Sequence, residues 1–172
     1  MANRTGTYIA FDGLGQTDPS KSDFKYYASI KAWSAGKFID FRYVDSHDKT
    51  YAVRDSSKRS TLEARIRERL AASKNVVVIL SPETRNSGSM LSYEIEKAVD
   101  VYELPLICMY PGYDAVTNPR QLAGRWPDSL TRRIDNATAN AIHIPFRKNP
   151  LLVALSQFTV HSGNLSGPLN HY

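Results

Sequence analysis

The sequence predicts a doubly wound α/β domain with a mainly parallel five-stranded sheet. Short apolar runs alternate along the chain with segments in which apolar residues have helical spacing. The run "NVVVIL" over 75–80 is continuously apolar and rich in valine. That composition is typical of a parallel strand covered on both faces. Five such strands favour the flavodoxin-like order 2-1-3-4-5.

The expected strands are the runs "TYIAF" (7–11), "KFIDFRYV" (37–44), "NVVVIL" (75–80), "LPLICMY" (104–110) and "AIHIPF" (141–146). A chain of 172 residues is long enough for one domain with a full hydrophobic core. We expect residues 1–160 to form this domain. The segment 161–172 has little to bury, so it is expected to be a mobile tail.

Helices are expected between the strands. In the segment 60–74, Ser60 and Glu63 have the spacing of a capping box, and Leu62, Ile66 and Leu70 form an apolar stripe. The other expected helices cover 22–36, 87–102 and 127–134, and the segment 149–160 is a last amphipathic stretch. Between 111 and 140 the pattern is weak, apart from the short helix at 127–134.

Composition narrows the function classes. The formal net charge of +5 is spread along the chain, which permits an anionic ligand such as a dinucleotide but lacks the basic stripe typical of nucleic-acid binding. No nucleic-acid partner is therefore expected. No apolar run is long enough to span a bilayer and the N-terminus has no leader, so we expect no membrane contact and a cytoplasmic location.

Cysteine and histidine content argues against a metal centre. The single cysteine, Cys108, rules out a disulfide framework and a cysteine metal cluster, and we interpret it as a small buried apolar residue. The histidines lack ligand spacing. We therefore expect no metal.

The stretch "FDGLGQTDPSKSD" over 11–23 partly matches a phosphate-binding P-loop. Gly15 is followed after four residues by "SKS", where Gly-Lys-Ser would be expected. A P-loop needs glycine directly before its lysine, and Pro19 has no N–H to offer a phosphate. We interpret the stretch as a turn above the first strand, made possible by Gly13 and Gly15.

Glu94 is the most informative polar residue. In the predicted sheet the ligand crevice lies outside the carboxyl ends of strands one and three, so the loops after Phe11 and Leu80 should face each other. Glu94 lies little more than one turn into the helix that follows the second of these loops. It falls at the edge of the stripe containing Leu91 and Ile95, which places a carboxylate at the shoulder of the core.

The segment "NVVVILSPETRNSGSMLSYEIEKAVDVYELPLICMY" (75–110) leads from a strand through a polar loop to Tyr93-Glu94-Ile95 and then to another strand. It resembles TIR domains, and more closely the TIR-like subfamily that includes the NAD-consuming subunit of the bacterial Thoeris antiphage system. The opening "TYIAFDG" is similar to that family's first strand and loop. The family often has tryptophan a few residues before the glutamate, where this chain has Met90.

The resemblance implies that Glu94 is the catalytic residue for cleaving the bond between nicotinamide and ribose in NAD. It also implies that Phe11 and Asp12 line the nucleotide pocket, and that Ser81, Thr84 and Asn86 border it.

We interpret the loop containing Gly13 and Gly15 as the rim of this pocket, and Phe11, Tyr93 and Trp33 are available to sandwich the bases. NAD is a substrate in this interpretation, so no cofactor is expected. A lone carboxylate suits the chemistry, because nicotinamide is already a cationic leaving group and the oxocarbenium-like ribose needs only electrostatic stabilisation.

The product stays open among ADP-ribose, cyclic ADP-ribose and a conjugate, which differ in the attacking nucleophile. The resemblance implies self-association, a phage trigger and an effector protein that senses the product. Two other functions stay open. One is a non-catalytic TIR-like or receiver-like module that binds partners, and the other is a nucleoside deoxyribosyltransferase-like enzyme, which also uses a glutamate on a glycosidic bond.

Overall fold

The computed structural model of the chain describes residues 3–12, 23–35, 43–44, 59–84, 89–163 and 165–171. Its strands are β1 (Gly6–Ala10), β2 (Tyr43–Val44), β3 (Ser73–Ile79), β4 (Leu106–Tyr110), β5 (Ala141–Pro145) and β6 (Asn170–His171). Its helices are α1 (Phe24–Ser34), α2 (Arg59–Ala71), α3 (Ser89–Asp100), α4 (Asp128–Asp135) and α5 (Lys148–Gln157), with the 3-10 helix η5 (Pro119–Arg125) before α4.

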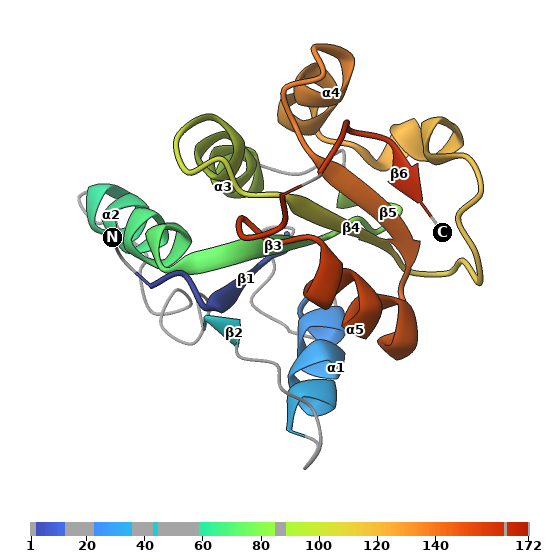
Figure 1. The fold of residues 1–172 in the computed structure, drawn as a ribbon, viewed down its shortest axis with the longest axis horizontal. Coiled ribbons are helices and arrows are strands. Elements are labelled where there is room, and N and C mark those ends of the chain that lie inside the picture. Colours follow the sequence, from blue (N-terminus) through green and yellow to red (C-terminus); the bar gives the residue numbers. More distant parts are fainter. Residues whose placement is uncertain are drawn as a thin grey trace.

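The strands form one parallel sheet in the order β2-β1-β3-β4-β5-β6, with helices on both faces (Figure 1). The predicted fold class and the order 2-1-3-4-5 are confirmed. The addition is β6, a strand of 2 residues at the β5 edge. Of the strand predicted over 37–44, the part 37–42 lies outside the described residues.

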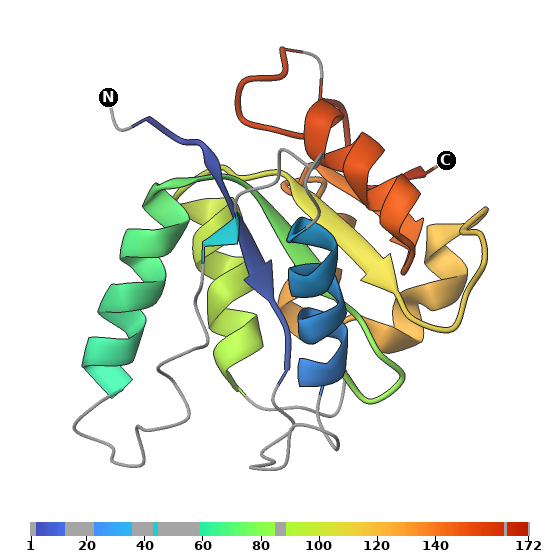
Figure 2. The same cartoon turned by 90° about the horizontal axis from the view of Figure 1, so that it is seen from below.

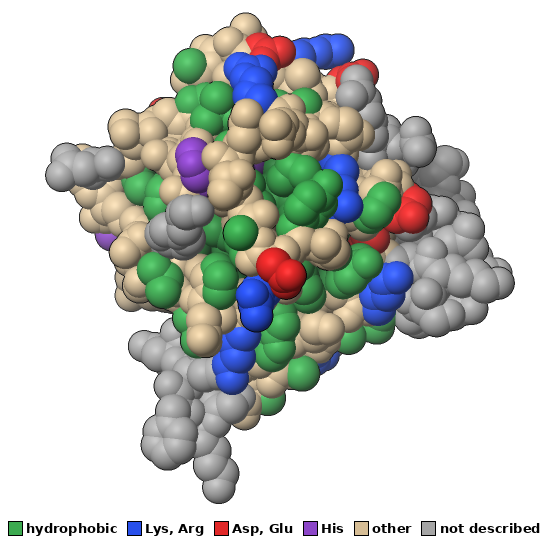
Figure 3. Space-filling view, turned by 90° about the vertical axis from the view of Figure 1, so that its right-hand side faces the viewer, with side chains coloured by type: hydrophobic (Ala, Val, Ile, Leu, Met, Phe, Trp, Pro, Cys, Tyr) green, Lys and Arg blue, Asp and Glu red, His purple; other side chains and the backbone are tan. Residues whose placement is uncertain are grey.

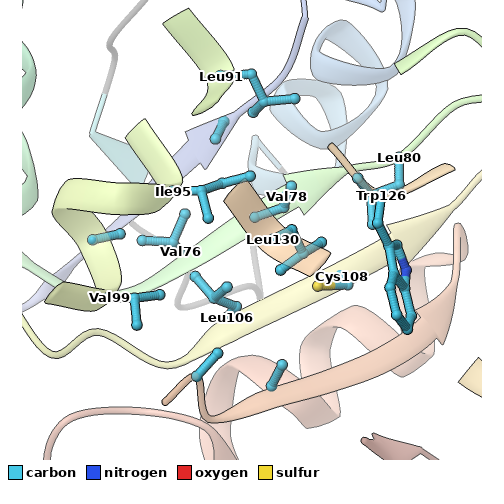
Figure 4. Close-up of a cluster of buried hydrophobic side chains, with 14 of the residues drawn as sticks. Val76, Val78, Leu80, Leu91, Ile95, Val99, Leu106, Cys108, Trp126 and Leu130 are labelled. Carbon is cyan, nitrogen blue, oxygen red and sulfur yellow. The ribbon is translucent and has the colours of Figure 1, made fainter. Parts of the chain in front are cut away.

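The sheet separates two apolar cores, because alternate residues of a strand point to opposite faces. The α3-side core contains Tyr8 of β1 and Val76 of β3, covered by α2, α3 and α4 (Figure 4). The α1-side core contains Ile9 and Val77 of the same strands, covered by α1 and α5 (Figure 2). Burial on both faces explains why the predicted strand over 75–80 shows no alternation of apolar and polar residues.

The start of α2 differs from the predicted capping box. The helix begins at Arg59, so Ser60 lies inside its first turn instead of preceding it. Glu63 pairs with Arg59, whose Nε lies 3.0 Å from Oε1, and an exposed pair one turn apart adds only a little to helix stability. Farther along, Ile66 and Leu70 are buried, as the predicted stripe requires.

The region 111–140, where the sequence pattern is weak, covers part of the sheet. Asn118 caps η5 by accepting a hydrogen bond from the Arg120 N–H at 3.2 Å, and η5 leads to Trp126, which is fully buried in the α3-side core. The Arg133 guanidinium of α4 donates to the Asp100 carboxylate of α3. These contacts attach the region to the sheet and to α3.

The segment after α5 contacts the edge of β5. Asn170 pairs with Ile142, and its side-chain amide donates to the Ala141 carbonyl at 3.1 Å. The Ala141 N–H donates to the Gly167 carbonyl at 3.1 Å. These hydrogen bonds satisfy backbone groups that an open strand edge would expose. The mobility of 161–172 stays a prediction.

Charged side chains are dispersed over the face that Figure 3 presents, where Lys and Arg lie among acidic, polar and apolar groups. Among the described residues, no helix combines the length and the apolar content that crossing a bilayer requires.

His143 links the chain's last segment to the core. It is fully buried on β5, with Nδ1 2.6 Å from the Tyr110 hydroxyl and Nε2 2.7 Å from the Pro168 carbonyl. A carbonyl only accepts, so Nε2 carries the proton and Nδ1 accepts from Tyr110, whose oxygen in turn accepts from Trp126 at 2.7 Å. Burial lowers the pKa of His143 to about 4, so the imidazole is neutral at physiological pH.

We expect the free energy of unfolding to fall as the pH drops from about 6.5 toward 4. Unfolded chains protonate His143 near its ordinary pKa of about 6.5, whereas the folded protein does so only near a pKa of about 4, so the unfolded state binds more protons in this window. His143→Gln removes this proton linkage. The stability advantage of the wild type in urea unfolding should therefore shrink by roughly 2 kcal/mol between pH 7 and 4. A stability advantage of the wild type that does not change with pH would contradict the lowered pKa of His143.

Candidate active site at the carboxyl ends of β1 and β3

Polar side chains from segments far apart in the sequence meet at one edge of the sheet. The connection that leaves β1 runs toward β2, whereas the connection that leaves β3 runs toward β4, so the switch point of the sheet lies between the carboxyl ends of β1 and β3. Figure 2 shows β1 pointing toward this edge, where α3 begins. The described residues that gather there are Asp12 after β1, Asp23 before α1, Ser81 and Thr84 after β3, and Glu94 on α3.

Glu94 lies deeper than its predicted place at the shoulder of the core. It is on the same side of α3 as Leu91 and Ala98, one turn away from each, and only 3% of it is exposed. The hydroxyl of Tyr8 donates to Oε1 of Glu94 across 2.5 Å. Oε2 is also buried and has no hydrogen-bond partner in the part of the chain that the structure describes.

The electrostatic environment of Glu94 favours its neutral form. Burial raises the pKa of Glu94 to about 8; the hydrogen bond from Tyr8 acts in the opposite direction, and the nearby carboxyl of Asp12 adds to the rise. Near neutral pH the free protein therefore holds a carboxylic acid here. Catalytic groups are often tuned in this way by desolvation and a like charge.

Asp23 directs its carboxyl toward the β3 loop. It precedes α1 but makes no side-chain cap, and its Oδ2 instead accepts from the Thr84 hydroxyl at 3.4 Å. Its backbone N–H donates to the Asp12 carbonyl at 3.3 Å, which joins the two ends of the intervening loop. Burial raises the pKa of Asp23 to about 6, against the lowering effect of hydrogen bonds from Ser81 and Thr84.

A tight turn after β3 holds Ser81 and Thr84 in place. The Ser81 N–H donates to Oγ1 of Thr84 at 2.8 Å, and the Thr84 N–H returns a hydrogen bond to the Ser81 carbonyl at 3.2 Å. Both residues are fully buried. Nearby, Arg125 donates through Nη1 to the Leu80 carbonyl at 3.1 Å and the Pro111 carbonyl at 2.7 Å, which ties the chain after β3 to the chain after β4.

The aromatic residues predicted for the site lie apart from Glu94. The ring of Phe11 stacks on Tyr27 at 5.2 Å in the α1-side core, across the sheet from Tyr8. Trp33 packs on Phe146 against the same core.

Tyr93 is half-buried beside Glu94 in the chain, and its ring is covered by the Lys97 ammonium at 5.4 Å.

Of the residues predicted for the site, the structure brings Asp12, Ser81, Thr84 and Glu94 together. Gly13, Gly15 and Asn86 lie outside the described residues.

Sequence reasoning missed Tyr8 and the side-chain role of Asp23. A tyrosine inside a strand covered on both faces needs a hydrogen-bond partner for its hydroxyl, which is a signal visible in "TYIAF". The partner, 86 residues away, could not be identified from that signal. Asp23 lies at the start of the helix expected over 22–36, and that position does not show where its carboxyl turns.

Comparison with known proteins adds a family match at this site. A family model described as "Thoeris protein ThsB, TIR-like domain" matches residues 8–116, the part of the chain that carries every residue gathered here. Among solved structures, the chain is similar to the 2-desoxiribosyltransferase from Leishmania mexicana. That similarity has a TM-score of 0.46 and 14% sequence identity, over 96% of this chain and 83% of that chain.

We expect Asp23→Asn to stabilise the protein at neutral pH but not at pH 4. The folded state holds the Asp23 proton up to a pKa of about 6, so its stability contribution is present below pH about 4 and is lost as the pH rises through 6. Asparagine avoids the buried charge, and the gain in the free energy of unfolding should reach roughly 2 kcal/mol at pH 7.5. Urea unfolding from pH 4 to 7.5 measures it.

The matched control is Asp128→Asn at the start of α4, where the side chain is exposed. It should show no gain at pH 7.5. A wild type that is more stable than Asp23→Asn at pH 7.5 would show that the Asp23 carboxylate is better compensated than this environment implies.

Proposed function

The chain belongs to the family of the TIR-like domain of Thoeris protein ThsB, and we propose that it cleaves the bond between nicotinamide and ribose in NAD, with Glu94 as the catalytic residue. One observation carries the proposal. The carboxyl of Glu94 is buried at the switch point of the sheet, with Oε1 held by Tyr8 and Oε2 without a partner among the described residues. That oxygen makes no hydrogen bond within the described part of the chain, which leaves its interactions to a substrate.

The reaction needs little more than the ionised form of this carboxyl, which the free protein reaches as the pH rises toward the Glu94 pKa of about 8. The nicotinamide of NAD carries a positive charge, so it leaves as a neutral molecule and needs no proton from a general acid. Positive charge then develops on the ribose, as in the transition state of glycoside cleavage. A carboxylate shielded from water stabilises that charge far more strongly than an exposed one, because the local dielectric is low.

Asp12 among the other gathered residues suits the binding of ribose. The carboxyl of Asp12 is close enough to raise the pKa of Glu94, and a carboxylate there can accept hydrogen bonds from ribose hydroxyls. We assign Ser81, Thr84 and Asn86 to the border of the pocket, and Gly13 and Gly15 to its rim. Phe11 supports this site from the other side of the sheet.

We place the reaction in antiphage defence in the cytoplasm. The product, whether ADP-ribose, cyclic ADP-ribose or a conjugate, acts as a signal for an effector protein after a phage trigger. Self-association accompanies the active state. The family membership supports this role, since it is the Thoeris TIR-like family that the chain matches.

We expect Glu94→Gln to abolish the loss of NAD during phage infection, with a fall of roughly a thousandfold in turnover. Glutamine has the shape of the protonated carboxyl that the free protein holds, so folding should be intact. Cells that carry the wild type or the variant are infected with a phage panel, and mass spectrometry measures NAD and its ADP-ribose derivatives. The matched control is Glu96→Gln, two positions along α3, where the side chain is 47% exposed and pairs with Lys97.

Each other result selects a different function. Retained NAD loss in Glu94→Gln would remove Glu94 from the chemistry. Protection from phage with unchanged nucleotides in both proteins would favour a partner-binding module. Release of a base from deoxyribonucleosides by purified protein, with NAD untouched, would favour a deoxyribosyltransferase.

A further inference from the structure

We propose that Tyr8 is a positioning residue of the active site, whose hydroxyl fixes Oε1 of Glu94 and so leaves Oε2 as the oxygen that meets the substrate. The inference rests on the proposed function of Glu94 and deepens it. Neither the family match nor the sequence pattern assigns Tyr8 a role.

The position of Tyr8 allows little movement. It lies within β1, paired in register with Val44 of β2 on one side and Val76 of β3 on the other. Its side chain is fully buried in the α3-side core. A phenol enclosed in a packed core cannot change rotamer without disturbing its neighbours, so its oxygen is a fixed point beneath α3.

The contact with Glu94 is short and selective. The distance of 2.5 Å from the phenol oxygen to Oε1 is typical of a strong hydrogen bond to a carboxylate. Oε2 is buried without a partner in the described part of the chain. In the ionised carboxylate, a buried Oε2 that lacks a partner costs free energy, and a substrate that supplies positive charge or a hydroxyl donor removes that cost. Tyr8 thereby determines which oxygen is available and in which direction it points.

The hydrogen bond from Tyr8 is the main interaction that stabilises the ionised form of Glu94. The described titratable side chains on the surrounding elements include Tyr8 and Asp12 on and after β1, Asp23 before α1, Arg59, Glu63, Arg65, Arg67, Glu68 and Arg69 on α2, Lys74 on β3, Glu83 after β3, Tyr93, Glu96, Lys97 and Asp100 on α3, and Arg125 at the end of η5. None of the cations among the described residues pairs with Glu94: Lys97 pairs with Glu96, and Arg125 donates to backbone carbonyls. Burial and the Asp12 carboxyl oppose ionisation of Glu94, whereas the Tyr8 hydrogen bond favours it.

Removal of the phenol should therefore have two effects. The carboxyl loses its orientation, which lowers the rate. It also loses the hydrogen bond that favours its ionised form, so its proton leaves at a higher pH. A residue that only filled space would lower the rate without moving the pH at which Glu94 ionises.

The test is Tyr8→Phe, with kcat/KM for NAD cleavage measured from pH 6 to 10 under conditions in which the wild type is active. We expect a fall of roughly tenfold to a hundredfold at pH 7 and an upward shift of about one unit in the midpoint of the pH profile. The matched control is Tyr27→Phe, another buried tyrosine, which lies in the α1-side core. Its midpoint should equal that of the wild type. A lower rate with an unmoved midpoint in Tyr8→Phe would overturn the proposal.

A second readout does not depend on activity. Difference infrared spectroscopy follows the protonated carboxyl band of Glu94, which is assigned by its loss in Glu94→Gln. We expect this band to titrate near a pKa of about 8 in the wild type and at a higher pH in Tyr8→Phe. A wild type that shows this titration but never cleaves NAD would overturn the proposed function alone. Equal midpoints in the two proteins would overturn the role of Tyr8, whatever the activity.

A further variant keeps the proposal testable if Tyr8→Phe does not fold. Incorporation of 3-fluorotyrosine at position 8 keeps the ring and makes the phenol a stronger donor. The midpoint for Glu94 should then move to a lower pH than in the wild type. No movement would count against the proposal.

Discussion

Parallel pairing of β1 with β3 is the constraint on which the rest of the structure depends. Parallel strands need crossover connections, so helices cover both faces and water reaches neither. Polar groups inside such a sheet must therefore find partners within the protein. The Thr7 hydroxyl donates to Asn75 of β3 at 2.6 Å, and the Asn75 amide donates to the Phe158 carbonyl after α5 at 2.8 Å. Tyr8 has the same need one residue later, and meets it through Glu94.

The parts of the fold that the sequence predicts are those set by local pattern. Val76, Val77 and Val78 identify a strand covered on both faces, and the spacing of Leu91 and Ile95 identifies the buried side of α3. Both patterns come from burial, which acts on every residue of an element in the same way. They place Glu94 at the carboxyl edge of the sheet, although its depth depends on β1, which lies beneath α3.

What the sequence leaves out is set by single contacts between distant segments. Ser60 has the spacing of a cap, but the helix already includes Arg59, which pairs with Glu63 one turn along. Asp23 reads as a helix opener, whereas a buried turn 61 residues away attracts its carboxyl. The Pro168 carbonyl accepts from His143 although neither residue belongs to a recognisable motif. Such contacts depend on geometry that no local pattern encodes.

The two tryptophans of the chain lie on opposite sides of the sheet, which gives the protein two built-in optical reporters. Trp126 is fully buried, and its indole N–H is hydrogen-bonded to Tyr110, which in turn contacts His143. The fluorescence emission of Trp126 should therefore respond to changes in the segment after α5, which contacts β5. Trp33 is half-buried on α1 against Phe146, so it reports on the other layer of helices. In a variant that retains only one of the two tryptophans, the intrinsic fluorescence reports on one layer of helices alone, without an added dye.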